Sequence, residues 1–478
     1  MTTIVWFRED LRLSDNPALF EAAERGDVLP VFVLENPDHC GETHPLGGAS
    51  QWWLHHSLES LEGALGGLLL RCGDARIAIP ALVQETGASA VYWNRCYEPR
   101  AIERDTDIKA DLKQRGVEVR SFKAGLLHEP WELETKSGGP FKVYSPFWRA
   151  AQQKTVDKPL PRPGELRLAP MPGGESLSDL GLLPKKPNWA AGWDDIWQPG
   201  EQGAMARLKS FLGNDLKGYG ELRNRPDLPN VSRLSPHLHF GEISPRQIHH
   251  ETGLAEEEVD GLEKDAAKFI SEIGWREFSY HLLYHFPTLP HTNFKPAFDA
   301  YPWRESADDL IAWQKGRTGY PIVDAGMREL WQTGYMHNRV RMIVASFLIK
   351  HLRLDWRHGE AWFRDTLVDA DLANNSASWQ WVAGSGADAA PYFRIFNPMS
   401  QGAKFDSEGT YVRKWVPELA ALDTAFIHAP FDAPHAALEK VGVRLGDTYP
   451  KPIVEHFAAR DAALAGYEAV KRGGEEAA

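Results

Sequence analysis

Cysteine is scarce in this sequence, with only three among 478 residues. Cys40, Cys72 and Cys96 are odd in number and lack the paired spacing of a metal site. This pattern argues against a disulfide-stapled secreted domain and favours reduced thiols in a cytoplasm. No run of 18 or more apolar residues occurs, and charge interrupts the opening MTTIVWFRED. The sequence therefore predicts a cytoplasmic protein without a signal peptide or a transmembrane segment.

Positive charge is also in deficit, because the formal net charge at pH 7 is −13. This balance argues against a protein coated in basic residues. It leaves DNA binding open, since a local basic patch is sufficient for that. Tryptophan, in contrast, is abundant, with 18 copies against 13 Tyr and 21 Phe. Most of these indoles must pack in the core, and a few are available as stacking platforms or electron carriers.

The first 130 residues alternate short apolar runs with helical patterns, which is typical of an α/β domain with a parallel sheet and crossover helices. Strands are predicted over residues 4–7, 28–34, 68–71, 90–93 and 117–122. Helices are predicted over residues 49–66, 76–86 and 99–115. The first strand runs into Arg8–Leu13 instead of GxGxxG, and no Walker A motif occurs. A Rossmann-like or flavodoxin-like sheet is therefore expected, but not an ordinary NAD or ATP module.

The remainder of the chain divides into three segments. Residues 131–200 are rich in Pro, Gly and Lys and are predicted to form a long interdomain linker. Residues 201–465 are predicted to form an all-α domain, and residues 466–478 a frayed tail. The helices expected in the α domain span 263–285, 307–314, 321–333, 338–352 and 358–368.

The segment Val231-Ser232-Arg233-Leu234-Ser235 precedes a predicted helix and combines hydroxyls, an Arg and free backbone N–H groups. Such a combination suits a phosphate or a pyrophosphate. A helix N-cap made by Ser232 or Ser235 explains the same residues without a ligand, and the sequence alone favours this simpler interpretation.

On a helix, Glu272, Trp275 and Arg276 lie at positions i, i+3 and i+4 and share one face. This face is too polar for a core and too aromatic for an ordinary surface. The competing interpretation is an exposed ion pair beside a half-buried Trp.

Two further segments carry unusual polar residues. Asn338, Arg339 and Arg341 open a helix whose later residues are apolar, so a phosphate ligand is plausible. His337 is interpreted as a hydrogen-bonded histidine and not as a base.

Residues 368–381 combine two acids, two amides and a Trp-x-Trp pair. The pairs His237/His239 and His249/His250 lack further metal ligands and are interpreted as surface histidines, and no metal site is expected.

Together these segments resemble the photolyase and cryptochrome family. The resemblance begins at Val5–Arg12, continues through Gly319–Ala325 and ends near Gly402–Asp406, so it covers most of the chain in order. It implies an N-terminal α/β domain, a long linker and a helical domain that holds FAD in a folded conformation.

The resemblance also implies roles for individual residues. Residues 231–235 and Tyr219 would surround the pyrophosphate and adenosine, and Arg341 would pair with Asp369. Asn375 would face flavin N5, because an amide can hydrogen-bond this atom without competing for its proton as a carboxylate would. The complete set of implied cofactor residues is Tyr219, Val231, Ser232, Arg233, Leu234, Ser235, Phe269, Glu272, Arg276, Asn338, Arg341, Asp369, Ala370, Asp371 and Asn375.

The activity implied by the resemblance is light-driven repair of cyclobutane pyrimidine dimers in DNA by a monomeric enzyme. Trp379, Trp356 and Trp303 match a relay that carries electrons from the surface to the flavin. Glu272 and Asn375 complete the implied catalytic set. The residues implied to contact the flipped-out lesion or its flanking phosphates are Trp275, Asn338, Arg339, Met342, Trp381, Arg394 and Gln401.

Several alternatives remain within and beyond the family. A cryptochrome-type blue-light receptor is the main rival, but plant-type receptors tend to carry Asp where this chain has Asn375. Repair of the (6-4) photoproduct would call for histidines where Asn338 and Met342 stand. A non-catalytic flavoprotein would need neither the relay nor the lesion residues.

Bacterial class III is the most similar group within the family, with class I second. Because Arg100-Ala101 replaces the Asn-Glu pair that contacts folate in class I, a methenyltetrahydrofolate antenna at another site is expected, with deazaflavin second.

Overall fold

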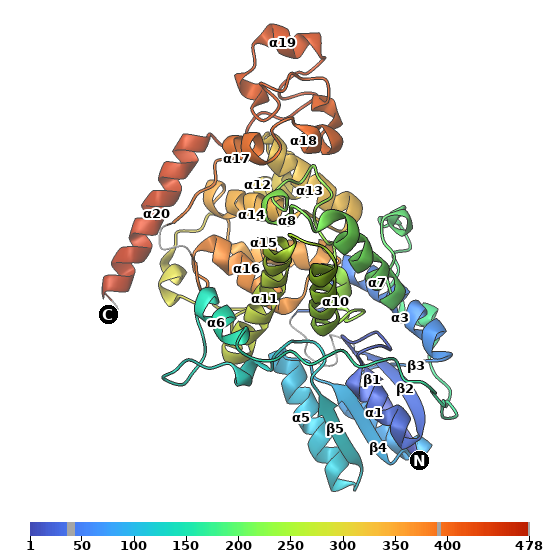
Figure 1. Cartoon of the computed structure of the whole chain (residues 1–478). Coiled ribbons are helices and arrows are strands. Elements are labelled where there is room, and N and C mark those ends of the chain that lie inside the picture. Colours follow the sequence, from blue (N-terminus) through green and yellow to red (C-terminus); the bar gives the residue numbers. More distant parts are fainter. Residues whose placement is uncertain (36–43, 390–392, 477–478) are drawn as a thin grey trace. The chain divides into compact units, whose positions relative to one another are not determined.

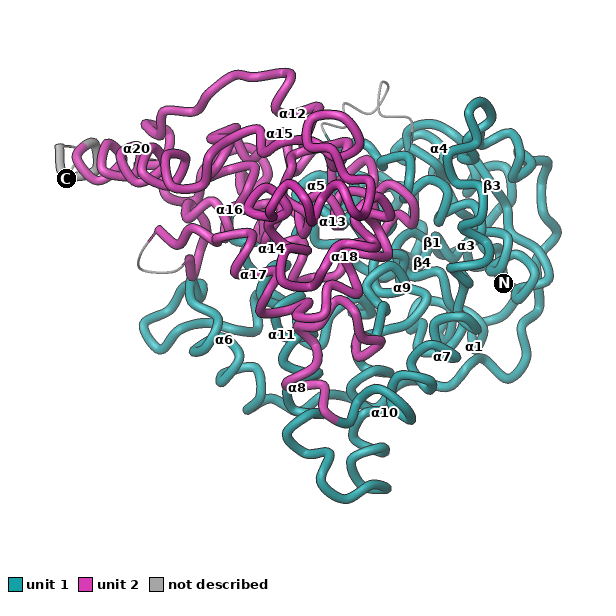
Figure 2. Tube along the Cα trace, turned by 90° about the horizontal axis from the view of Figure 1, so that it is seen from above, with its two compact units in different colours: residues 1–217, 232–287, 368–373 teal, residues 218–231, 288–367, 374–478 magenta. Residues whose placement is uncertain are grey.

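The computed structural model describes residues 1–35, 44–389 and 393–476, so Cys40 lies outside the described residues. The chain forms two compact units (Figure 2). Unit 1 comprises residues 1–217, 232–287 and 368–373, and unit 2 comprises residues 218–231, 288–367 and 374–478. The chain therefore crosses between the units several times, and the units do not follow the segment boundaries expected at 130 and 200.

Unit 1 contains a five-stranded parallel sheet of order β3-β2-β1-β4-β5 (Figure 1). Its strands are β1 (Thr2–Phe7), β2 (Asp27–Leu34), β3 (Leu69–Cys72), β4 (Ala90–Asn94) and β5 (Glu118–Phe122). Strand β1 lies centrally and pairs with both β2 and β4, with Ile4 opposite Leu29 on one side and Val91 on the other. Each of the five predicted strands is confirmed within two residues.

Helices α1 (Pro17–Arg25), α3 (Gly48–Leu65), α4 (Ala75–Thr86) and α5 (Pro99–Gln114) connect these strands. The three predicted helices are confirmed, whereas α1 was not predicted. Asn16 caps α1 by accepting the Leu19 N–H, and Pro17 occupies the first helical position. The core of the sheet is built from strand residues without solvent exposure, such as Ile4, Trp6 and Val91, packed on helix residues such as Ile79.

The expected linker belongs to unit 1 and carries short helices, including α6 (Tyr144–Ala151). After it come α7 (Glu201–Ser210), α9 (Ser235–His239), α10 (Pro245–Glu258) and α11 (Glu263–His285). Helix α11 has the predicted bounds. It begins with acidic residues in its first turn and ends with His285, an arrangement that suits the helix dipole.

Unit 2 is helical. Helices α12 (Ala307–Gln314) and α13 (Pro321–Thr333) have the predicted bounds, and α15 (Trp356–Thr366) begins two residues early. The helix predicted over 338–352 is α14 (Asn338–Ser346) continued by a π-helical turn, η6 (Phe347–His351). The other helices are α8 (Tyr219–Leu222), α16 (Leu372–Ala383), α17 (Pro398–Phe405), α18 (Thr410–Trp415), α19 (His435–Lys440) and α20 (His456–Glu476).

The prediction of a frayed tail from residue 466 was wrong, because helix α20 continues to Glu476. Ala463 and Val470 are buried seven residues apart on its inner face. Tyr467 stacks on Phe393 with ring centroids 4.7 Å apart. This apolar stripe holds the helix in unit 2 despite its Gly-rich and acidic end. No helix among the described residues combines the length and the apolar character that crossing a membrane requires.

Candidate functional site

Helix α11 carries four predicted site residues of unit 1. Phe269 is buried against Phe211, with ring centroids 4.7 Å apart. Arg276 donates to the Gly125 carbonyl at 2.7 Å. Glu272 forms an ion pair with Lys268 at 2.7 Å. An ion pair beside Trp275 is what the competing interpretation expected, but the partner of Glu272 is Lys268 and not Arg276.

The Trp275 indole rests on a support that the sequence did not indicate. Tyr144 of α6 stacks on it with ring centroids 3.7 Å apart and planes 9° apart. The Tyr144 hydroxyl donates to the Ser271 carbonyl of α11 at 2.6 Å, which fixes the phenol against the helix. Because Tyr144 covers one face of the half-buried Trp275, a ligand can stack only on the opposite face.

The predicted acids of unit 1, Asp369 and Asp371, are buried. Asp369 accepts the Ser235 hydroxyl at 2.5 Å, so Ser235 binds a carboxylate and does not cap α9. Burial and, secondarily, the nearby Asp371 carboxylate raise the pKa of Glu9, while His239 opposes this rise. These clustered carboxylates are suited to ligand hydroxyl or amino donors.

The interpretation of His237 and His239 as surface residues was wrong. His237 and His239 are 3% and 7% exposed, and the His237 ring bonds to the buried Glu242 carboxylate. Glu242 also accepts the Trp53 indole N–H at 3.0 Å. A buried carboxylate thus satisfies His237, which spacing alone did not reveal. His249 is exposed as expected.

The predicted phosphate segment has an unusual backbone. Arg233 adopts φ of 52°, a left-handed conformation that is uncommon for a residue other than Gly. The Ser232 carbonyl accepts a hydrogen bond from Arg207 at 2.7 Å, and Leu234 is buried. Such local strain is frequent at ligand sites. Tyr219 and Val231 belong to unit 2, where the Arg223 guanidinium lies 5.7 Å from the Tyr219 ring.

The start of α14 in unit 2 is cationic. Arg339 donates twice to Asn224 Oδ1, at 2.7 and 3.2 Å. Burial, Arg223 and Arg394 all lower the pKa of Arg339, so positive charges are gathered here. His337 caps the helix by accepting the Arg339 N–H at 3.1 Å, which confirms its interpretation as a hydrogen-bonded histidine. Asn338 is exposed and Met342 is half-buried, so both are accessible.

Arg341 donates to the Met336 carbonyl at 2.7 Å. Its pairing with Asp369 stays a prediction, because the two residues belong to different units.

Asn375 is oriented by a neighbour that the sequence did not indicate. Its Nδ2 donates to the Glu360 carbonyl at 3.1 Å and to Glu360 Oε1 at 2.9 Å. Burial raises the pKa of Glu360, whereas Arg364 and Asn375 lower it. Since both described bonds of the Asn375 side chain use Nδ2, the Oδ1 acceptor remains for a ligand.

The three relay tryptophans all belong to unit 2. Trp379 and Trp356 are buried, and Trp303 is half-buried beside Tyr301 at 4.5 Å. Trp356 donates its indole N–H to Asn293 at 3.0 Å. Trp379 packs between Phe363 and Trp313, with ring centroids at 4.9 and 6.3 Å. Two buried indoles and one accessible indole suit an electron path that ends at the surface.

The remaining lesion residues of unit 2 lie near the end of α16 and beyond it. Trp381 is half-buried and donates its indole N–H to the Asp388 carbonyl at 3.1 Å. Arg394 is exposed, and Gln401 lies half-buried on α17.

The residues present fit a flavin nucleotide. Among the described residues, the buried Ser376 hydroxyl and the buried Trp379 indole N–H have no hydrogen-bond partner. They lie on α16, the helix that also carries Asn375. Buried polar groups of a native protein are normally satisfied, so a ligand is the natural partner for this helix.

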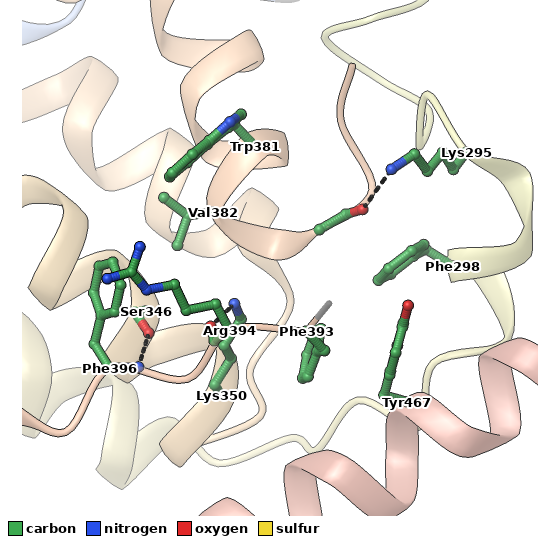
Figure 3. A pocket seen from close by; sticks show the side chains of 11 residues that line it. Lys295, Phe298, Ser346, Lys350, Trp381, Val382, Phe393, Arg394, Phe396 and Tyr467 are labelled. Carbon is green, nitrogen blue, oxygen red and sulfur yellow. Dashed lines mark hydrogen bonds between the residues drawn. The ribbon is translucent and has the colours of Figure 1, made fainter. Parts of the chain in front are cut away.

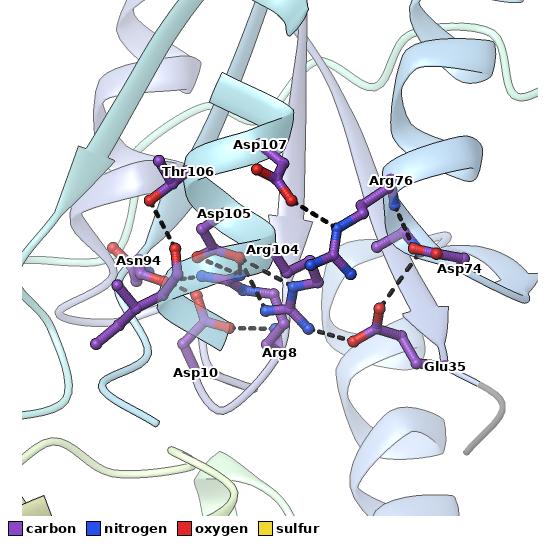
Figure 4. Close-up of polar contacts among 12 residues, drawn as sticks. Arg8, Asp10, Glu35, Asp74, Arg76, Asn94, Arg104, Asp105, Thr106 and Asp107 are labelled. Carbon is purple, nitrogen blue, oxygen red and sulfur yellow. Dashed lines mark hydrogen bonds and ion pairs between the residues drawn. The ribbon is translucent and has the colours of Figure 1, made fainter. Parts of the chain in front are cut away.

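The carboxyl ends of the central strands, where an α/β domain ordinarily binds nucleotides, are filled by ion pairs (Figure 4). Arg8 and Arg104 both bond to Asp105, at 2.9 Å in each case. Both guanidinium groups lie over the Trp6 ring, at 4.2 and 4.8 Å. Arg104 also binds Glu35. These arginines are already paired with carboxylates.

Comparison with known proteins gives matches along the chain. Residues 3–164 match the family model of DNA photolyase, and residues 269–469 match the FAD binding domain of DNA photolyase. The chain is 55% identical over 477 residues to the deoxyribodipyrimidine photo-lyase of Agrobacterium fabrum, with 98% of each chain covered. It is 40% identical over 477 residues to cryptochrome-2 of Arabidopsis thaliana, covering 96% of this chain and 77% of that protein.

A solved structure is also similar to the whole chain. The structure of a bacterial class III photolyase from Agrobacterium tumefaciens matches with a TM-score of 0.95 and 54% identity, covering 98% of both chains.

Proposed function

The chain belongs to the DNA photolyase and cryptochrome family, and from this premise we propose that it repairs cyclobutane pyrimidine dimers in DNA under light. The observation that carries the proposal is the group of arginines in unit 2. In a chain with a net charge of −13, Arg339 donates to Asn224, the neighbour of Arg223 in the sequence, and both Arg223 and Arg394 lower the pKa of Arg339. A local concentration of positive charge in an acidic protein is what binding to a DNA backbone requires.

FAD is the cofactor, as the FAD binding domain over residues 269–469 indicates. Reduced FAD supplies, on illumination, the electron that splits the dimer. The residues proposed to hold it are Tyr219 and 231–235 at its phosphates and adenosine, Phe269 and Arg276 of α11, and Arg341, Asp369, Ala370 and Asp371. Asn375 would present its carbonyl oxygen to flavin N5–H, because Glu360 holds the amide nitrogen.

The lesion would leave the duplex and stack between aromatic side chains. Trp275, stiffened by Tyr144, provides one platform, and Trp381 the other. Glu272 and Asn338 would bond to the base edges, with Met342 beside them. Arg339, Arg394 and Gln401 would hold the flanking phosphates and fix the register of the strand.

Trp379, Trp356 and Trp303 would carry electrons inward from the surface to recharge the cofactor. This role requires an accessible terminal indole, and Trp303 is half-buried, whereas Trp356 and Trp379 are buried. The relay is separate from repair itself, since its role is only to recharge the cofactor.

The proposed antenna is methenyltetrahydrofolate, with deazaflavin second. Support for a site other than the class I folate pocket comes from Arg100-Ala101 at the start of α5 and from the ion pairs that fill the carboxyl ends of the strands. An absorption spectrum of the purified protein, with extraction and chromatography of its chromophores, identifies the antenna.

We also propose that the protein is a monomer located in the cytoplasm. Light scattering after size-exclusion chromatography tests the monomeric state.

The experiment for the proposed function uses the full chain with chemically reduced FAD and an oligonucleotide that contains thymine dimers. Thymine absorbance should recover under blue or near-ultraviolet light and not in the dark. A second oligonucleotide with a (6-4) photoproduct should remain unchanged. Absence of recovery on both substrates would favour a blue-light receptor. Recovery on the second substrate alone would show that the enzyme repairs (6-4) photoproducts and not cyclobutane dimers.

A further inference from the structure

A cavity of about 160 Å³ lies within unit 2, close to the end of α16 (Figure 3). Only two of its lining residues, Trp381 and Arg394, are among the predicted lesion and phosphate contacts. The other lining residues come from the segment before α12, from α14 and η6, from α16, from the segment between α16 and α17, and from α20. The lining residues are Lys295, Phe298, Ser346, Lys350, Trp381, Val382, Gly384, Phe393, Arg394, Phe396 and Tyr467.

One side of this cavity is an aromatic wall. Phe393 and Tyr467 stack with ring centroids 4.7 Å apart and planes 9° apart, and Phe298 lies 6.0 Å from Tyr467. Gly384 keeps the wall open, with φ of 94°. A Cβ atom there would lie 3.2 Å from Phe298 and 3.4 Å from Phe393. Phe393 is covered by Tyr467 and Lys350, and Lys471 lies over Tyr467, so Phe298 is the ring of this wall on which another flat ring would stack.

The polar groups of the cavity are cationic. The Lys350 side chain is 4% exposed, donates to the Arg394 carbonyl and lies 4.5 Å over the Phe393 ring. An ammonium group has three N–H donors, and the described residues supply only this one acceptor. Lys295 adds a second ammonium group, 3.4 Å from the Gly384 carbonyl. No acidic residue occurs among the eleven described lining residues.

The lowered pKa of Lys350 agrees with this deficit of hydrogen-bond acceptors. Burial and, secondarily, Arg394 lower the pKa of Lys350 to about 7. A buried ammonium group without an anion or sufficient acceptors is costly. A ligand that brings acceptors or negative charge would remove this cost, so the cavity selects for an acceptor-rich or anionic ring compound.

We propose that this cavity captures a purine base left unpaired opposite the dimer when the dimer leaves the duplex. The inference rests on the proposed function. Purines are flat and carry ring-nitrogen acceptors for Lys350, and the phosphate of the same nucleotide would meet Lys295 and Arg394. Extrusion of a dimer leaves two bases without partners, and capture of one of them offsets part of the unpairing cost. The residues shared with the predicted lesion contacts, Trp381 and Arg394, favour DNA over a free nucleotide.

The test uses two duplexes, each with 2-aminopurine in place of one of the two adenines opposite a single thymine dimer, with the holoenzyme in the dark. The principal variant is Lys350→Met, which keeps the length of the side chain but removes its donors and charge. Lys440→Ala, an exposed lysine on α19, is the matched control. Thermal melting and bound FAD are measured for each variant. If Lys350→Met fails to fold, Phe298→Leu replaces it, since this change removes the flat ring and keeps apolar volume.

Wild type and Lys440→Ala should give the same change in 2-aminopurine fluorescence on binding, and Lys350→Met should lose most of it. The affinity of Lys350→Met for dimer-containing duplex should fall about tenfold, the effect of one lost base contact. Its affinity for single-stranded dimer DNA should stay at the wild-type value, because no opposing base exists there. Equal fluorescence changes, or equal weakening on single and double strands, would overturn the proposal.

Failure of the proposed repair function can be distinguished from failure of the proposed purine capture. If the proposed function fails, the wild-type protein repairs neither single- nor double-stranded dimers. If only the inference fails, both substrates are repaired by the wild type, and Lys350→Met behaves like Lys440→Ala on duplex DNA. A fluorescence change from 2-aminopurine placed beside the dimer, and none from the opposite position, would also overturn it.

Discussion

Gly359 on α15 is the position where one methyl group should disturb the relay. A Cβ atom at Gly359 would lie 2.1 Å from Trp379 Cη2 and 2.7 Å from Leu348 Cδ2. Trp379 has little room to retreat, since Phe363 and Trp313 pack against it. Gly359→Ala therefore forces either the indole or the helix to move.

The size of the effect follows from two opposing terms. Carbon atoms in contact sit at roughly 3.5 Å, so the indole and the methyl group must separate by about 1.4 Å. Such overpacking costs about 1–3 kcal/mol. Replacing Gly by Ala in a helix gains at most about 1 kcal/mol. We expect Gly359→Ala to lower the free energy of unfolding by about 1 kcal/mol and to slow photoreduction of the bound flavin.

The matched control is Gly253→Ala on α10, where an added Cβ meets nothing within 4 Å. This variant should be as stable as the wild type or up to about 1 kcal/mol more stable. The assays are urea denaturation and the rate of flavin reduction under blue light with an external donor. If Gly359→Ala is stabilised like the control and is photoreduced at the wild-type rate, Trp379 is not confined as the structure indicates.

Four further changes give distinct outcomes. Trp379→Phe should block flavin photoreduction and spare repair by chemically reduced enzyme; equal loss of both activities, with FAD bound, would make the role structural. Arg394→Ala should reduce the salt dependence of binding to damaged DNA by a slope of about one, and an unchanged slope would move the DNA path elsewhere. Tyr144→Ala should loosen the Trp275 platform and weaken dimer binding, with little effect on undamaged DNA; an unchanged preference for damage would exclude that role. Burial raises the pKa of Glu277 from 4.5 to about 7, so the folded state holds a proton that the unfolded state releases, and stability should fall as pH rises across this window. In Glu277→Gln this fall, at most about 3 kcal/mol, should be absent when urea melts at pH 5 and pH 8 are compared.

Periodicity was sufficient to predict the five strands of the sheet and eight of the helices. The five strands are short apolar runs on a buried sheet, and the bounds of α11, α12 and α13 could be read from the sequence. Helix α1 was missed although Asn16-Pro17 is an N-cap followed by a first-turn proline. The error at α20 came from weighting the composition of its last residues over the buried pair Ala463 and Val470.

The candidate site was less predictable, since its supporting contacts join residues far apart in the sequence. The stacking of Tyr144 on Trp275 and the bond from Asn375 to Glu360 depend on the packing of separate helices. No local pattern specifies such contacts. The burial of His237 was also not predicted. Its partner Glu242 lies only five residues further along the chain, but the spacing of these residues does not show that both are buried.

The most direct measurement of the central claim uses a duplex with one thymine dimer inside a restriction site, which the dimer makes resistant to cutting. The reduced holoenzyme is supplied at a small molar fraction of the DNA and illuminated, and the restored cutting is counted per enzyme molecule. Light-driven repair by this chain predicts many restored sites per enzyme, none in the dark, and a severe loss in Glu272→Ala with FAD retained. No restored site under light, or the same number in the dark, would contradict it.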